Sequence, residues 1–289
     1  MPTPSVPSRT LAVSRMRTLG LGWLGLWLLA LLAGPALLSW LGLAVHPHGH
    51  ATLYAHGHPF VDARSFLGLP NAMDVLSNLP LAAAGVLGLW VLGRRHVAVD
   101  TWQALLVFFG GLVLTALGSA WYHLQPDPLG LVIDRAGMAV TFAGALSLAV
   151  AERASPSLAS QALCLALLTA LASAVLPFSH GHVLPWVVVQ FGGMVLIGWA
   201  ALQPPVAGAL GVRLGWVLAL YALAKLLEMA DEGVFQFTGG LVSGHTLKHL
   251  CAAAAAWPVI AALRAVRLGQ NAPTARRAAA SRHSNTTAS

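Results

Sequence analysis

The sequence predicts an all-α protein, a polytopic bundle of transmembrane helices, and three observations support this prediction. The chain of 289 residues is 57% hydrophobic and has a mean hydropathy of +0.73. Only 9% of its residues are charged, whereas a soluble domain has about 25%. Its apolar residues fall into eight long runs separated by charged residues, Pro or Gly. Since a span needs about 20 apolar residues, these runs leave no room for a large soluble domain.

Each apolar run is expected to form one transmembrane helix. The expected helices cover residues 19–45, 72–93, 101–123, 132–151, 158–176, 184–203, 213–231 and 245–266. The first run is longer than the roughly 7–15 apolar residues of a signal-peptide core, so we expect a retained helix. Cleavage after about residue 36 or 45 is the competing interpretation.

The basic residues predict the orientation of the bundle, because cytoplasmic loops of membrane proteins are rich in Lys and Arg. With eight spans and both termini in the cytoplasm, only Arg64 and Arg135 fall at the outer side. The cytoplasmic side then contains Arg9, Arg15, Arg17, Arg94, Arg95, Arg153, Arg213, Arg264, Arg267, Arg276, Arg277 and Arg282. The net charge of +7 is therefore a signal of membrane topology, and we expect no nucleic-acid partner.

On this topology the chain divides into five segments. They are a cytoplasmic tail (1–18), an extra N-terminal transmembrane helix (19–45), an outer loop (46–71), a seven-helix core (72–266) and a disordered cytoplasmic tail (267–289). The outer loop begins with HPHGHATLYAHGHPF, which has five histidines between His46 and His58. We interpret this stretch as a flexible linker of biased composition, with a metal-gathering loop as the alternative.

Polar and ionisable residues occur inside the expected spans, where a charged side chain costs about 3 kcal/mol on insertion scales and marks function by default. They form five clusters, which all fall in the outer half of the bilayer on the expected topology. We infer one polar cavity that opens outward. The clusters are Asn71, Asp74, Ser77 and Asn78; Ser119 and His123; Asp134 and Arg135; Lys225, Glu228, Asp231 and Glu232; and His245, Lys248 and His249.

The histidines of these clusters predict a metal site. His245 and His249 are four residues apart and share one face of a helix, within reach of a single ion. His123 completes a set of three, which leaves the fourth tetrahedral position to water, as in catalytic zinc sites. The alternative is that these histidines are packed or interfacial. Lys248 points about 100° away from His249 on the helix, so we expect it to snorkel or to contact a substrate, and not to bind the metal.

Two further residues suit hydrolytic chemistry beside such a metal. Asp134 can accept a proton from zinc-bound water and pass it to a leaving amine. Ser119 lies one turn before His123 on the same face and can donate to a developing oxyanion. The alternatives are an interfacial ion pair with a neighbouring arginine for Asp134 and a small helix-packing residue for Ser119.

These motifs resemble the alkaline ceramidases, a family in the superfamily of seven-helix membrane hydrolases that also includes the adiponectin receptors. The resemblance covers roughly residues 60–265 and is carried by GSAWYHL, DRAGM and SGHTLKHL. It implies that His123, His245 and His249 bind one Zn²⁺, with Asp134 and Ser119 as the catalytic residues of a seven-helix catalytic core. It also implies hydrolysis of the amide bond of ceramide-type lipids, giving a sphingoid base and a fatty acid. The stretch AKLLEMADE is similar to an acidic helix of the family, and there Glu228 and Asp231 would orient ligand histidines.

The chain departs from the family pattern in two places. The eukaryotic ceramidases have an acidic calcium-binding stretch before the first core helix, whereas FVDARSFLGLPNAMDVLSN has fewer carboxylates, so we do not expect calcium dependence. The N-terminal span makes eight helices where the family core has seven. Neither departure falls in the three histidine-containing or aspartate-containing motifs.

Other functional classes are compatible with parts of this pattern. A divalent-metal transporter would use the histidine-rich loop and the intramembrane carboxylates, but the inner half of the expected membrane region has few polar groups. A haem protein is disfavoured because His245 and His249 point in one direction. A non-catalytic lipid receptor of the same superfamily is a third alternative. The expected partners are the membrane and a ceramide-like lipid, with the site toward the outer half of the bilayer; the sequence leaves the oligomeric state open.

Overall fold

The fold is all-α, as the sequence predicts. The computed structural model describes residues 6–42, 60–180 and 183–266. Within these residues all regular elements are helices, apart from an isolated bridge between Phe66 and Leu69. In chain order the helices are α1 (Val6–Trp40), α3 (Ala72–Leu76), α4 (Leu79–Leu92), α5 (Val99–Leu124), α6 (Pro128–Arg153), α7 (Pro156–His180), α8 (Leu184–Val187), the π-helix η1 (Val188–Gly192), α9 (Gly193–Ala201), α10 (Leu214–Met229), α11 (Asp231–Phe237), α12 (Gly244–Ala254) and α13 (Trp257–Ala265).

Seven helical segments of the described chain are long and apolar enough to cross a membrane, so the protein is a multi-pass membrane protein. Three of them are composite, because α3 and α4, α8 to α9, and α12 and α13 each make one segment. The run at 213–231, which we expected to be an eighth span, forms the 16-residue helix α10 and the start of α11. At 1.5 Å per residue α10 is about 24 Å long, shorter than the ~30 Å hydrocarbon core. It nevertheless packs inside the bundle against α9, α12 and α13.

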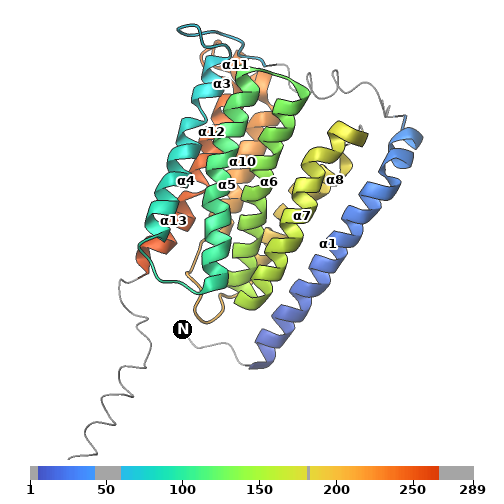
Figure 1. Ribbon diagram of the computed structural model, residues 1–289, viewed down its shortest axis with the longest axis vertical. Helices are drawn as coiled ribbons and strands as arrows, with labels where there is room; N and C mark the ends of the chain where they lie inside the picture. Colours follow the sequence, from blue (N-terminus) through green and yellow to red (C-terminus); the bar gives the residue numbers. More distant parts are fainter. Residues whose placement is uncertain (1–5, 43–59, 181–182, 267–289) are drawn as a thin grey trace, which may run out of the picture.

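The helices form one compact group with a flank on one side (Figure 1). The group contains α4, α5, α6, α10, α12 and α13, and α7 packs on α6 at its edge. Helix α1 is outermost and contacts α7, α8 and η1. Short helices α3 and α11 and the start of α12 lie together at the upper end in Figure 1, whereas α13 lies at the lower end. The segments that carry the predicted site therefore gather at one end of the bundle.

Two tryptophans attach α1 to the rest of the protein. The indole N–H of Trp23 donates to the carbonyl oxygen of Val188 in η1 at 3.1 Å, and that of Trp27 donates to Ser173 Oγ in α7 at 2.7 Å. Both indoles are buried, although much of the remaining surface of α1 is exposed and apolar. The sequence predicted this span at 19–45; the helix begins earlier, at Val6, and ends at Trp40.

Glycines let α5 and α6 approach each other closely. They recur every seven residues, at 111 and 118 on α5 and at 137 and 144 on α6. A Cβ atom at Gly118 would lie 2.8 Å from the carbonyl oxygen of Ile133 and 3.1 Å from the Cα atom of Asp134. Small residues at helix crossings are the usual way to pack helices in lipid, where no hydrophobic force joins them. This contact brings the end of α5 next to Asp134.

A buried glutamate at the end of α6 organises the connection between α9 and α10. The carboxylate of Glu152, 1% exposed, accepts hydrogen bonds from the backbone N–H groups of Leu210, Gly211 and Val212 at 2.7, 2.9 and 2.8 Å. The Arg153 guanidinium, which we used as a topology signal, donates to the Val212 carbonyl at 3.0 Å. These contacts fix the point at which α10 enters the bundle.

Replacing Glu152 with alanine should destabilise the fold without acting on the distant histidines. Three backbone donors would lose a charged acceptor, and hydrogen bonds to charged groups contribute about 1.5–3 kcal/mol each, so a loss of at least about 2 kcal/mol is expected. Thermal unfolding of the detergent-solubilised protein measures this. The control is Ser157→Ala, an exposed residue near the same turn, which should change stability by less than about 0.5 kcal/mol. Equal melting temperatures for both variants would contradict this role.

Candidate metal centre

Three histidines from two distant segments meet at the upper end of the bundle. His123 lies in the last turn of α5, and His245 and His249 lie in the first two turns of α12. Their side chains are buried, with residue exposures of 1, 4 and 3%. One ring nitrogen from each lies within 4.8 Å of the others, and the Nε2 atoms of His123 and His245 are 3.1 Å apart.

This geometry fits a metal ion held by three imidazoles. Tetrahedral zinc with Zn–N bonds of about 2.0–2.1 Å separates neighbouring ligand nitrogens by about 3.3 Å. The observed Nε2 separation is close to that value. Three neutral nitrogen donors occupy three tetrahedral positions and leave one for a water molecule or a substrate atom.

Ser77 fixes the ring orientation of His249. The Ser77 hydroxyl donates to the carbonyl oxygen of Asp74 at 3.1 Å, and its oxygen lies 2.7 Å from Nδ1 of His249. A metal ion bound at Nε2 of His249 requires the ring proton on Nδ1, and in that tautomer Nδ1–H donates to the Ser77 oxygen. Nε2 of His249 then carries the lone pair that a metal ion would bind. This is the arrangement by which a second residue sets the tautomer of a metal-binding histidine.

The start of α12 is capped by residues of two helices. Ser243 is the N-cap residue and accepts from the backbone N–H of Thr246 at 3.0 Å. The carboxylate of Asp74, in α3, accepts from the Thr246 hydroxyl at 2.9 Å and from that of Ser243 at 3.4 Å. Capping and a nearby negative charge both stabilise a helix N-terminus. Asp74 thereby ties α12 to α3, the short helix that Ser77 directly follows.

Asp231 and Gly244 set the distance between α12 and α10. The carboxylate of Asp231 accepts from the backbone N–H of His245 at 2.7 Å, so this residue acts on the helix backbone rather than on an imidazole ring. A Cβ atom at Gly244 would lie 2.1 Å from the carbonyl oxygen of Leu227. Only glycine allows this approach, which carries His245 inward.

His123 is held from the segment that precedes α3. Asn71, in the left-handed region at φ 45°, donates from Nδ2 to the carbonyl oxygen of His123 at 2.8 Å. The ring of Phe60 meets the His123 ring edge-on, with 4.8 Å between centroids. Residues 60–71, which we call the covering segment, thus fix both the backbone and the ring of this histidine.

An ion pair fastens the same covering segment outside the membrane-spanning helices. Arg64 donates to both carboxylate oxygens of Asp62 at 2.6 Å and also to the carbonyl oxygen of Leu241, just before α12. The hydrogen bond from Arg64 lowers the pKa of Asp62 from its ordinary value, against the opposing effect of burial. The carboxylate therefore stays ionised at neutral pH and keeps the segment joined to the α11–α12 connection.

Ser119 and Asp134 lie beside the histidines. Ser119 is buried, and its Oγ lies 3.4 Å from Nε2 of His249. Both residues line the cavity described next. The structure therefore brings together all five residues that the sequence singled out, His123, His245, His249, Asp134 and Ser119.

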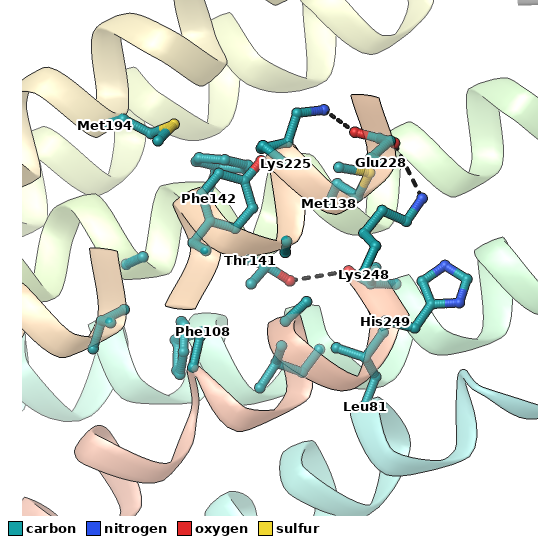
Figure 2. A pocket seen from close by; sticks show the side chains of 18 of the residues that line it. Leu81, Phe108, Met138, Thr141, Phe142, Met194, Lys225, Glu228, Lys248 and His249 are labelled. Atoms are coloured by element: carbon teal, nitrogen blue, oxygen red, sulfur yellow. Dashed lines mark hydrogen bonds and ion pairs between the residues drawn. The ribbon is translucent and has the colours of Figure 1, made fainter. Parts of the chain in front are cut away.

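A long, mostly apolar cavity, which His249 of this cluster lines, lies between α5, α6, α9, α10 and α12 (Figure 2). The charged residues of its lining gather at one end, near Ser119 and His249, whereas Thr115, Thr141 and Tyr221 lie among the apolar residues of the wall. On α5 the lining runs from Ser119 down to Phe108, eleven residues, or about 16 Å at 1.5 Å per residue. The remainder of the wall is mainly Leu, Met, Phe, Ala, Ile and Val side chains.

Lys248 does not snorkel away from the site, which was one of the two roles that the sequence suggested for it. Its ammonium group lies in the cavity, 3.1 Å from Glu228 and 2.9 Å from Nε2 of His245. Glu228 contacts two lysines, Lys225 and Lys248.

Sequence reasoning recognised Asn71, Asp74 and Ser77 as polar residues within or at a span but gave them no role. Ser77 touches His249 across 172 positions of the chain. Their common signal was the cluster PNAMDVLSN at the outer end of an apolar run.

Removing the Ser77 hydroxyl should weaken metal binding while leaving all three histidines in place. Loss of a residue that orients a metal ligand costs about 10–100-fold in affinity. Competition between Ser77→Ala protein and a chromogenic zinc chelator measures the change. Ser147→Ala is the matched control, because this buried serine donates to a carbonyl oxygen of α7. Zinc affinities of the Ser77 and Ser147 variants that agree within about twofold would contradict the proposed orienting contact.

Comparison of the chain with protein-family models, with curated proteins and with solved structures gave no match. The functional assignment consequently rests on the residues themselves and on the geometry that the fold gives them.

Proposed function

We propose that the protein is a zinc-dependent intramembrane hydrolase that cleaves the amide bond of ceramide-type lipids. The observation that carries this proposal is the position of the three-histidine cluster. One of its members, His249, lines a long, mostly apolar cavity near its charged end, and a carboxylate and a hydroxyl, those of Asp134 and Ser119, line the same cavity. A metal site alone is compatible with many functions, but a metal site that adjoins a long, mostly apolar cavity favours a lipid substrate.

The donor set favours zinc and an open coordination sphere. Imidazole nitrogens suit zinc, and three protein ligands with one free position are typical of catalytic zinc. When bound there, zinc activates water as a nucleophile and polarises a carbonyl group. The protein supplies the dry surroundings, since His123, His245 and His249 are all buried.

Asp134 and Ser119 would manage the proton and the charge. Asp134 would take a proton from the attacking water and return it to the amide nitrogen. The new C–O bond and the broken C–N bond then give a carboxylic acid and a free amine, with all protons accounted for. Ser119, which lines the cavity with Asp134 and lies near His249, would keep the carboxylate oriented toward the reaction centre.

The cavity would hold an acyl chain with its amide at the polar end. An apolar chain gains about 0.8 kcal/mol per buried CH₂ relative to water, although lipid tails already enjoy most of that gain in the bilayer. The wall around Leu112, Met138 and Phe142 therefore selects by shape more than by hydrophobicity. The same wall argues against ion transport, because it offers a cation few ligands below the histidines.

The test is metal-dependent turnover by the purified protein. Wild type should bind one equivalent of zinc and release fatty acid from a ceramide, and removal of zinc with a chelator should reduce the rate to that of buffer. His245→Ala should lose both zinc and activity. His96→Ala is the control and should retain both, because it changes an exposed histidine in the connection between α4 and α5.

Two results would contradict the proposal. One is equal turnover by zinc-free and zinc-loaded protein. The other is stoichiometric zinc binding with no product from any acylated lipid in a membrane extract, which would favour the non-catalytic lipid receptor.

A further inference from the structure

The side chain of one lysine lies beside the histidine cluster instead of extending toward the membrane surface. Lys248 immediately precedes His249 in α12, and its side chain is only 16% exposed. Its Nζ atom is 2.9 Å from Nε2 of His245, one of the nitrogens that face the candidate metal position. Asp134 is also within electrostatic reach of this ammonium group. Lys248 thus contacts a candidate metal ligand and lines the cavity together with Asp134.

Glu228 holds this ammonium group in place. One carboxylate oxygen of Glu228 accepts from Lys248 at 3.1 Å, and the other contacts Lys225. Figure 2 shows the two lysines approaching Glu228 from opposite sides at the polar end of the cavity. Since Glu228 and Lys225 belong to α10 and Lys248 to α12, the three charges span two helices and restrict the motion of the Lys248 side chain.

Helix pairing alone is a weak explanation for this arrangement. A buried ion pair contributes little net stability, because desolvation offsets much of the attraction. Charged side chains inside a membrane bundle usually mark a functional site. The contact with Nε2 of His245 is the more informative one. That nitrogen cannot accept a hydrogen bond and bind a metal at the same time, so metal binding directs the ammonium group to an oxygen atom in the cavity.

We propose that Lys248 donates a hydrogen bond to the carbonyl oxygen of the substrate and stabilises the negative charge that develops there during amide hydrolysis. This inference rests on the proposed function. Lys248 transfers no proton: the attacking water gives its proton to Asp134, the C–O bond forms, the C–N bond breaks, and the proton goes to the amine. Lys225 and Glu228 are positioning residues, because they act through Lys248.

The expected effect separates transition-state stabilisation from substrate binding. Loss of one donor to a developing oxyanion lowers kcat by about 10²–10³-fold. Lys248→Met should show this loss, with one equivalent of zinc retained and KM changed by less than about threefold. Its affinity for an anionic, tetrahedral phosphonate analogue of ceramide should fall by a similar factor. Lys225→Met removes an equal charge from the same glutamate and should lower both quantities by less than about tenfold.

Lys248→Arg keeps a cation and guards against misfolding of the methionine variant. It should keep phosphonate affinity within about tenfold of wild type. Unchanged kcat and phosphonate affinity in zinc-loaded Lys248→Met would overturn the inference while leaving the proposed function intact. Loss of zinc from a folded Lys248→Met protein would overturn it too, by showing a role in holding the metal site. An inactive wild type that binds zinc would refute the proposed function and this inference together.

Discussion

The histidine cluster depends on how the first turn of α12 is held. Two buried carboxylates grip it: Asp231 binds the backbone N–H of His245, and Asp74 binds the hydroxyl of Thr246. The N-terminus of a helix has unpaired N–H groups and a partial positive charge, so both contacts are favourable inside the bundle. Because His245 and His249 are rigidly spaced on that helix, fixing its first turn fixes two of the three candidate ligands at once.

The third candidate ligand reaches the cluster through close packing. Glycines at the α5–α6 crossing allow the end of α5 to approach Asp134, and Asn71 binds the carbonyl oxygen of His123. The site is thus assembled by backbone contacts more than by interactions of the imidazoles themselves. Ser77 adds a direct contact with an imidazole, since its oxygen meets the His249 ring. Such a scaffold suits chemistry that needs ligands held within fractions of an ångström.

Much of this fold was predictable because membrane-spanning helices are recognisable in a sequence by their length and apolar composition. The polar clusters also predicted which residues would meet, since intramembrane charges gather where they can interact. What the sequence could not supply is which side chains of different helices face each other. Whether Ser77 or another nearby polar residue touches His249 depends on helix rotation, which one sequence does not encode locally. Similarly, Lys248 was expected to snorkel or to contact a substrate, and only the position of Glu228 on α10 shows why it stays inside. The short length of α10 was missed because polar residues at its end prolonged the apparent run.

The two tryptophan contacts of α1 have a consequence for how that helix sits among lipids. Hydrocarbon offers an indole N–H no acceptor, and an unsatisfied polar group there costs several kcal/mol. Turning α1 by one residue step, about 100°, would withdraw both Trp23 and Trp27 from Val188 and Ser173. Much of the exposed surface of α1 is apolar, so lipid alone would leave this helix free to rotate about its axis. The two hydrogen bonds fix that rotation.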